Sequence, residues 1–320
     1  MADDLQIVGL GMATLDVLLR LKDMPTWDCG TRIDEFRFDG GGPVGTAMVA
    51  AAKLGTNVGF IGTAGMDKSA EIKLESMVDA GVDLSHLVKR DGPDDQVIVV
   101  HVHAETGERT FCGVGNISRK PLHVDELDKD YIISADYLHL EGFHYDAALQ
   151  AAKWMKEAGK TVTYDGSKTS GSVGENTRRL IEYVDVLITG KGFAKGLTGL
   201  SDLKEAGKEA LKMGPGVFVE TLGEDGCYTV TADDDFHTPA FDVNVIDTTG
   251  AGDVFHGAYI VGLLHGWNLR QLALFSSAVS ALKCTKLGGR SGIPNFDEVM
   301  DFLGKRGIKF GSSGLSVEII

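Results

Sequence analysis

The alternation of short apolar segments with helical segments rich in small residues most constrains the fold of this 320-residue chain. Strands that alternate with helices are typical of a mostly parallel sheet with helices on both faces, so we predict a doubly wound α/β fold. The expected strands are residues 6–10, 58–61, 137–140, 161–165, 184–188 and 217–221. The expected helices are residues 46–54, 69–80, 146–158 and 201–213.

Two segments, residues 12–38 and 96–112, interrupt this alternation. The first contains a stretch of alternating polarity at residues 31–38, and the second contains similar stretches at residues 97–103 and 109–112. Such stretches joined by a short turn are typical of antiparallel strands. We therefore predict that the two segments form one small β-sheet inserted into the α/β domain, where it acts as a lid.

Composition and charge limit the possible partners and the location. A net charge of −15 disfavours nucleic acid and anionic membranes. The four cysteines are far apart and lack metal-ligand or redox spacing, which is typical of free thiols in a reducing compartment. Asp16 and glycines break the apolar run at residues 7–19, which is too short to span a membrane. We expect a cytoplasmic single domain of residues 1–310, followed by a tail of residues 311–320.

The strongest chemical signal is residues 247–258, Asp-Thr-Thr-Gly-Ala-Gly-Asp-Val-Phe-His-Gly-Ala. The small residues Gly250, Ala251 and Gly252 lie where a helix is expected to begin, and backbone N–H groups at a helix N-terminus bind anions. Asp253 would lie in the first turn, beside that anion. A carboxylate there suits a general base for a hydroxyl that attacks phosphorus. The alternative is that Asp253 only caps the helix.

Two further glycine-containing segments could contact a ligand. Residues 40–43, Gly-Gly-Gly-Pro, precede an expected helix, and glycine allows a ligand to approach the backbone closely. Residues 221–226, Thr-Leu-Gly-Glu-Asp-Gly, follow a strand, where ligands often bind in parallel sheets. Each segment could equally be a turn without a ligand. Residues 9–11, Gly-Leu-Gly, lack the third glycine of a dinucleotide fingerprint, and the chain has no Walker A sequence.

These three segments, in this order, resemble the PfkB or ribokinase-like family of sugar kinases over nearly the whole chain. Residues 247–253 are similar to the C-terminal signature of that family, and residues 41–55 resemble its N-terminal signature. The resemblance implies a doubly wound α/β domain with a small β-sheet lid. It also implies transfer of a phosphoryl group from ATP, with Mg²⁺, to a hydroxyl of a small sugar or polyol.

The resemblance implies a role for each matching residue. Asp253 would be the catalytic base, and Gly250, Ala251 and Gly252 would form the anion hole for the transferring phosphoryl group. The implied sugar contacts are Asp16, Gly41, Gly42, Thr46, Glu141 and Asp253. The implied nucleotide contacts are Thr221, Gly223, Gly226, Gly250, Gly252 and Ala281. The candidates for a monovalent cation site, for K⁺, are Asp247, Thr249 and Ser291.

The chain also departs from the ribokinase pattern. Ribokinases have asparagine where Thr46 stands and lysine where Pro43 stands, and the Asn-x-x-Glu motif of the family is absent at residues 190–193. The Gly-Gly-Gly-Pro segment, the Val-Phe-His-Gly after Asp253, and residues 281–290 most resemble sulfofructose kinases within the family. The alternatives are therefore a sulfofructose or 6-phosphosugar kinase, a nucleoside kinase, or a catalytically silent sugar-binding protein.

The charges at the implied sugar site favour a neutral acceptor. Asp16 and Glu141 are both acids, which accept hydrogen bonds from hydroxyls and repel a sulfonate or phosphate. An anionic acceptor would need a cation from the lid, namely Arg32, Arg37 or Arg109. In this family such a lid also pairs with a second copy, so a homodimer through the lid is a further expectation.

Overall fold

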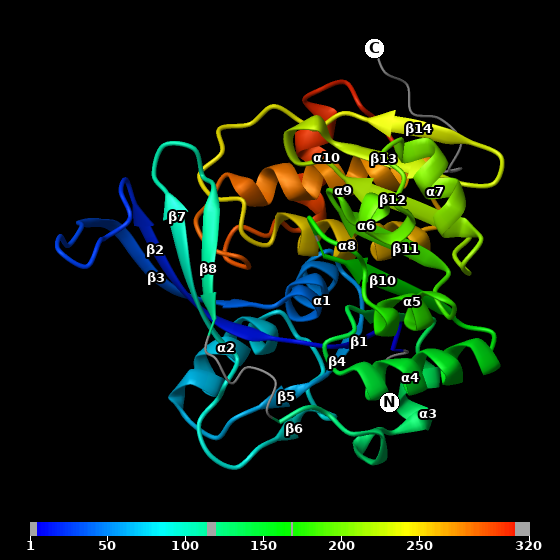
Figure 1. The fold of residues 1–320 in the computed structure, drawn as a ribbon, viewed down its shortest axis with the longest axis horizontal. Coiled ribbons are helices and arrows are strands. Elements are labelled where there is room, and N and C mark those ends of the chain that lie inside the picture. Colours follow the sequence, from blue (N-terminus) through cyan, green and yellow to red (C-terminus); the bar gives the residue numbers. More distant parts are fainter. Residues whose placement is uncertain (1–4, 114–119, 168, 311–320) are drawn as a thin grey trace.

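The computed structural model describes residues 5–113, 120–167 and 169–310, so the predicted tail at residues 311–320 lies outside the described residues (Figure 1). The central sheet has eight strands: β1 (Ile7–Leu10), β4 (Val58–Ile61), β9 (Tyr137–Leu140), β10 (Thr161–Gly166), β11 (Val186–Gly190), β12 (Val217–Thr221), β13 (Cys227–Val230) and β14 (Asp235–Thr238). They are arranged in the order β14-β13-β12-β11-β10-β9-β1-β4.

Neighbouring strands from β4 to β12 are parallel, and the hairpin of β13 and β14 adds an antiparallel edge. The parallel strands are almost wholly buried, as expected for strands covered on both faces. Helices on one face are α1 (Pro43–Lys53), α2 (Lys68–Asp79), α8 (Ala251–Leu264), α9 (Leu269–Cys284) and α10 (Phe296–Gly304). Helices on the other face are α3 (Lys129–Ser134), α4 (Tyr145–Glu157), α5 (Glu175–Ile181), α6 (Phe193–Thr198) and α7 (Leu203–Leu211). This arrangement confirms the predicted doubly wound α/β fold.

A separate four-stranded sheet projects from the body, at the left of Figure 1. Its strands are β2 (Thr14–Leu21), β3 (Ile33–Gly41), β7 (Val97–His103) and β8 (Arg109–Gly113), in the order β3-β2-β7-β8. Leu18, Val100 and Val102 are buried against Leu287 of the body. We refer to these four strands as the lid sheet. The two interrupting segments of the sequence therefore do meet in one sheet.

The lid sheet differs in one respect from the antiparallel arrangement that we expected. The outer pairs are antiparallel, but β2 and β7 at the centre are parallel. β2 enters the lid sheet from β1 of the body. After β3 the chain returns to the body, and β7 enters the lid sheet from the body again, so β2 and β7 run in the same direction. A short sheet of β5 (Thr63–Ala64) and β6 (Val88–Lys89) lies in the connection from β3 to β7.

Several predicted boundaries also differ from the structure. The glycine run is the end of β3 rather than a loop, and α1 begins at Pro43, a residue suited to the first helical turn. Asp146 lies inside α4 and does not cap it, because His144 is the residue before the helix. The structure also contains α3, α5, α6, α9 and α10, which we did not predict. Among the described residues, no helix is long and apolar enough to cross a membrane.

Candidate active site

The first turn of α8 brings the predicted base and anion hole together. Gly250 precedes the helix with a φ of 74°, a left-handed conformation that glycine adopts without strain. The N–H groups of a first helical turn have no acceptor within the helix, so those of Gly252 and Asp253 can bind an anion. The Ala251 N–H already contacts the Thr248 carbonyl at 3.2 Å. Of the predicted anion-hole donors, Ala251 is therefore the one that is already engaged.

Asp253 lies in this first turn and is half-buried. Burial and the negative charge of Asp165 raise the pKa of its carboxyl, and the positive charges of Arg109, Lys283 and Arg290 oppose that rise. A carboxylate with a raised pKa is a stronger base, and a catalytic base works best when its pKa lies near the working pH. The environment of Asp253 therefore suits proton abstraction. Asp253 is not the residue that caps α8, since Gly250 holds that position.

Asp16 lies on β2, at the base of the lid sheet, and is 4% exposed. Its Oδ1 accepts a hydrogen bond from the Thr14 hydroxyl at 2.6 Å. A Cβ atom at Gly41 would lie only 2.2 Å from its Oδ2, so this position on β3 admits no side chain. Burial raises the pKa of Asp16 to about 6, and the charges of Asp39 and Asp253 act in the same direction. Asp16 and Asp253 are therefore close enough to influence each other.

Glu141 follows β9 and faces the same site. Its Oε1 accepts a hydrogen bond from the Met12 N–H at 2.7 Å, whereas its Oε2 is shielded from solvent and has no partner among the described residues. Burial raises the pKa of Glu141 well above its ordinary value, and Asp165 and Asp253 add to the shift. Asp16 and Glu141 therefore carry less negative charge at neutral pH than two carboxyls with ordinary pKa values would.

The predicted nucleotide loop lies at the carboxyl end of β12. Residues 223–225 form a short 3₁₀ turn, η2 (Gly223–Asp225), and Gly226 has a φ of 88°. The Thr221 hydroxyl donates to the Thr189 carbonyl at 3.0 Å, so its side chain holds two strands together. Ala281 lies on α9, next to Ser280, whose hydroxyl donates to the Ala251 carbonyl at 2.7 Å. The start of α8 and this part of α9 are therefore adjacent.

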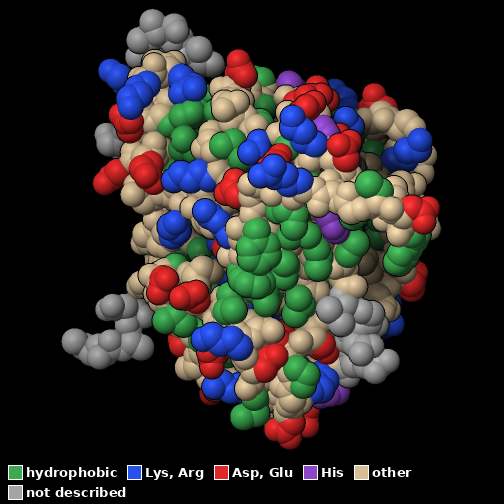
Figure 2. Space-filling view, turned by 90° about the vertical axis from the view of Figure 1, so that its left-hand side faces the viewer, with side chains coloured by type: hydrophobic (Ala, Val, Ile, Leu, Met, Phe, Trp, Pro, Cys, Tyr) green, Lys and Arg blue, Asp and Glu red, His purple; other side chains and the backbone are tan. Residues whose placement is uncertain are grey.

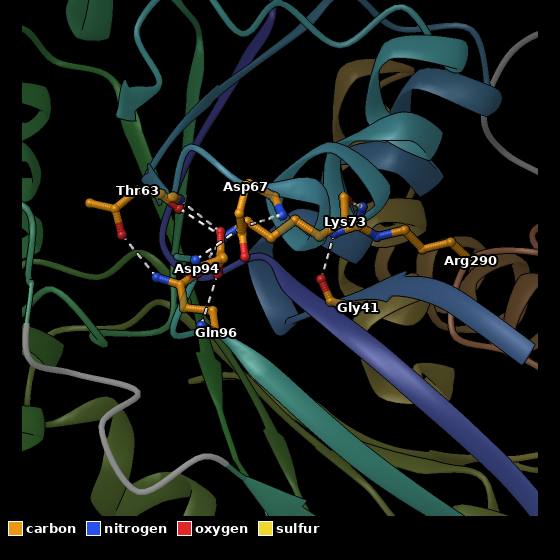
Figure 3. Close-up of polar contacts among 9 residues, drawn as sticks. Gly41, Thr63, Asp67, Lys73, Asp94, Gln96 and Arg290 are labelled. Atoms are coloured by element: carbon orange, nitrogen blue, oxygen red, sulfur yellow. Dashed lines mark hydrogen bonds and ion pairs between the residues drawn. The ribbon is translucent and has the colours of Figure 1, made fainter. Parts of the chain in front are cut away.

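A fully buried arginine lies behind the sugar side of the site (Figure 3). Arg290 is 1% exposed and donates to the carbonyls of Gly41 and Lys73. Its Nε lies 3.4 Å from the Thr46 hydroxyl, and Thr46 is itself fully buried. The structure therefore places the Thr46 side chain against Arg290, behind the surface at which we expected it to contact the sugar.

The same view shows a buried ion pair formed by Lys73 of α2 and Asp94 (Figure 3). Lys73 and Asp94 lie 2.7 Å apart, and both side chains are fully buried. Lys73 also donates to the Thr63 carbonyl and to the Gln96 side chain, and Asp94 accepts the backbone N–H of Gly65. Gln96 directly precedes β7, so this network anchors the base of the lid sheet to the body.

The three cation-site candidates are all close to the loop at residues 288–291. Asp247 accepts the N–H groups of Thr249 and Gly288, each at 2.8 Å, and the Ser291 hydroxyl donates to Asp39 at 2.8 Å. The Thr249 hydroxyl is buried and has no partner among the described residues. The buried ammonium of Lys283 donates to the Asp247 carbonyl at 2.9 Å, which places a positive charge at this loop.

The structure adds residues that the sequence did not indicate. Asp165 is the second-to-last residue of β10 and lies near Asp253. Its place at the end of a predicted strand could have drawn attention to it. His256 lies one turn after Asp253, and its Nε2 is 3.4 Å from Asp165 Oδ1. Lys283 and Arg290 lie within residues 281–290, which the sequence singled out only as a resemblance, without a role for either side chain.

Comparisons with known proteins agree with this geometry. Residues 6–295 match the model of the pfkB family carbohydrate kinases. A ribokinase from Staphylococcus aureus is 29% identical over 92% of this chain and 98% of its own, and an ATP-dependent ribose-1-phosphate kinase from Halopiger xanaduensis is 28% identical over 94% and 99%. The structure of Arabidopsis thaliana ribokinase complexed with ribose and ATP is similar, with a TM-score of 0.80 at 21% identity, over 94% of this chain and 99% of that one.

Proposed function

Because this chain belongs to the pfkB family of carbohydrate kinases, it is an ATP-dependent phosphotransferase, and we propose that its acceptor is a primary hydroxyl of a small uncharged sugar or polyol. The observation that carries this proposal is the convergence of Asp253, Asp16 and Glu141. The charge of Asp253 raises the pKa of each of the other two. Asp253 would accept the hydroxyl proton, and the start of α8 would stabilise the transferring phosphoryl group.

ATP would enter as its complex with Mg²⁺, which is supported by a solved structure of a ribokinase-like protein from E. coli in complex with both. The residues at the position of the missing family motif do not suit a protein-held Mg²⁺. Residues 190–193 carry no carboxylate or amide side chain, and the neighbouring Glu220 already accepts the N–H groups of Gly192 and Ala194. We therefore treat Mg²⁺ as part of the nucleotide substrate, held by phosphate oxygens and water.

The choice of acceptor is tested by an assay over neutral and anionic sugars. We expect kcat/KM for ribose, fructose or inositol to exceed that for fructose 6-phosphate, sulfofructose or ribose 1-phosphate by about tenfold or more, because a like charge beside Asp16 costs at least about 1.4 kcal/mol. ADP release measured with each acceptor at pH 8, where Asp16 is ionised, gives the comparison.

A preference for an anionic acceptor by more than tenfold would contradict this proposal. The lid arginines would then become the first residues to replace, above all Arg109, which donates to the Thr248 hydroxyl at 2.7 Å and whose charge reaches Asp253. That outcome would favour the 6-phosphosugar or sulfofructose alternatives, and a preference for a nucleoside would favour the nucleoside kinase. No ADP release with any acceptor would favour the silent sugar-binding alternative.

A monovalent cation site at Asp247, Thr249 and Ser291 remains a prediction. The Thr249 hydroxyl supports it, because this hydroxyl is buried and has no partner in the part of the chain that the structure describes, whereas the Lys283 ammonium already supplies positive charge at the Asp247 carbonyl. We therefore expect K⁺ to raise activity by about tenfold at most, equivalent to about 1.4 kcal/mol. The measurement compares turnover in KCl and in tetramethylammonium chloride at equal ionic strength. Identical rates in the two salts would mean that the loop binds no K⁺.

We also propose that the lid sheet pairs with a second copy of the chain through its outer face. Phe36 and Phe38 on β3 are 53% and 50% exposed, and their rings lie 5.0 Å apart. The strand register places Leu19 and Val17 of β2 beside them on the same face. Figure 2, which views the molecule from the lid side, shows hydrophobic side chains gathered on this surface. Such a patch is typical of an interface.

The mass in solution tests this pairing. We expect the protein to be a dimer at micromolar concentration by light scattering, and the double variant Phe36→Asp/Phe38→Asp to be a monomer, because two charges would be buried at the interface. Val78→Asp is the matched control, since Val78 is also exposed but lies on α2. A monomeric wild-type protein would rule out the dimer.

A further inference from the structure

A polar layer runs beneath α8, between otherwise apolar contacts. His139 on β9 and Thr163 on β10 are paired in the sheet, and Asp165 lies two residues further along β10 on the same face. His256 faces them from α8, with its ring 5.3 Å from that of His139. One ring nitrogen of His139, one ring nitrogen of His256 and one carboxylate oxygen of Asp165 all lie within 4.8 Å of one another. This buried group directly adjoins the first turn of α8, where Asp253 lies.

The hydrogen bonds indicate how the two histidines are oriented. The Thr163 hydroxyl contacts the Leu138 carbonyl at 3.3 Å as a donor, so it accepts the His139 Nδ1–H at 2.9 Å. His256 Nε2 lies 3.4 Å from Asp165 Oδ1, while His256 Nδ1 has no partner among the described residues, so the Nε2–H points at Asp165. Burial lowers the pKa of both histidines, to about 3 for His256, so both are uncharged. They can orient Asp165 but cannot neutralise it.

We propose that Asp165, oriented by His256, is a positioning residue that sets how tightly Asp253 holds a proton during phosphoryl transfer. This inference rests on the proposed role of Asp253 as the base. Asp165 and His256 are in contact, and His256 lies one helical turn from Asp253 on α8, so the two carboxyls share one largely enclosed region at the start of α8. Two carboxyls in such a region cannot both ionise freely, because each raises the proton affinity of the other.

The effect of Asp165 has a defined place in the reaction. The acceptor hydroxyl forms a bond to the γ-phosphorus, the bond from that phosphorus to ADP breaks, and the hydroxyl proton passes to Asp253. Burial raises the pKa of Asp165 to about 7, so above neutral pH Asp165 is negative and favours that last transfer. Three cations, Arg109 from β8, Lys283 from α9 and Arg290 from the loop after α9, act in the opposite direction. Among the described residues, the other ionisable groups around the two carboxyls include Asp16, Glu141, Tyr164, His139 and His256.

The test is the pH profile of kcat/KM for Asp165→Asn. The rate falls in acid as Asp253 becomes protonated, and removal of the Asp165 charge lowers the pKa of Asp253. We expect the acidic limb to move to lower pH by about one unit, since coupled carboxyls interact by at least about that much. At pH 8 we expect a lower kcat, because the base is weaker, with an unchanged KM for ATP. Asp165→Glu, which keeps the charge, should leave the limb close to its wild-type position.

Two controls make the outcomes distinguishable. Asp233→Asn removes the same charge at an exposed position and should leave the profile unchanged. His256→Leu removes the donor that stabilises ionised Asp165, so its acidic limb should also move to lower pH, and this variant carries the test if Asp165→Asn does not fold. An unmoved limb in a folded Asp165→Asn or His256→Leu protein, with Asp253→Asn inactive, overturns this inference alone. Near-normal turnover of Asp253→Asn overturns the proposed function itself.

Discussion

Replacing Asp253 by Asn is expected to lower turnover by about 10²–10⁴, which is the usual contribution of a general base. Asparagine has nearly the same shape but cannot accept the proton of the attacking hydroxyl. The helix start remains in place, because the left-handed residue before α8 is Gly250 and the Asp253 side chain does not cap the helix. Nucleotide binding should therefore be largely retained. Single-turnover kinetics together with ATP titration measure the two properties separately.

Asp253→Asn should be as stable as the wild-type protein, so a measurement of stability is the control that separates loss of the base from unfolding. The pKa of Asp253 is raised in the folded protein, so the folded state binds more protons than the unfolded chain at intermediate pH. Stability contributed by the protonated carboxyl is therefore lost as pH rises through the folded pKa. Asparagine avoids that loss, so the melting temperature at pH 8 should equal or exceed that of the wild-type protein. A variant that is inactive because it has unfolded would say nothing about the base, and near-normal turnover would exclude the assignment.

Replacing Lys73 by Met is expected to destabilise the protein by about 3–5 kcal/mol, because loss of one partner leaves a buried charge uncompensated. Asp94 lies 2.7 Å from Lys73, and both side chains are fully buried. Asp94 would keep backbone hydrogen bonds from Gly65 and Gln96 but would have no cation in contact. Urea unfolding of the two proteins at pH 7 gives the difference in the free energy of unfolding.

The chain offers a matched control on the same helix. Lys68 pairs with Glu71 at 2.6 Å, but the two side chains are 79% and 68% exposed. Exposed pairs contribute at most about 1 kcal/mol, so Lys68→Met should change stability by less than that. If the two lysine variants unfold at the same urea concentration, the buried Lys73–Asp94 pair contributes no more to stability than the exposed Lys68–Glu71 pair. A loss confined to Lys73→Met would establish the network as the anchor of the lid sheet.

Local patterns in the sequence were sufficient for the fold class. Each parallel strand is a short apolar run, and each main helix is a separate segment, so the alternation of the two is visible without any tertiary contact. The short helices α3, α5 and α6 were missed, because each has only six or seven residues and little room for a periodic pattern. The longer helices α9 and α10 were not predicted either. The parallel pairing of β2 with β7 was also missed, since the direction of a strand depends on the connection that leads to it.

The sequence by itself also indicated the start of α8, because the small residues Gly250 and Gly252 lie directly before Asp253 where the helix begins. Only the tertiary structure brought Asp165 and His256 together beside Asp253, and only it buried Arg290 behind Gly41. It also showed that the Thr46 side chain faces Arg290. The physical reason is that strand order and helix packing decide which distant residues meet. Burial then shifts the pKa values of these residues. A local sequence pattern specifies neither which distant residues meet nor how deeply they are buried.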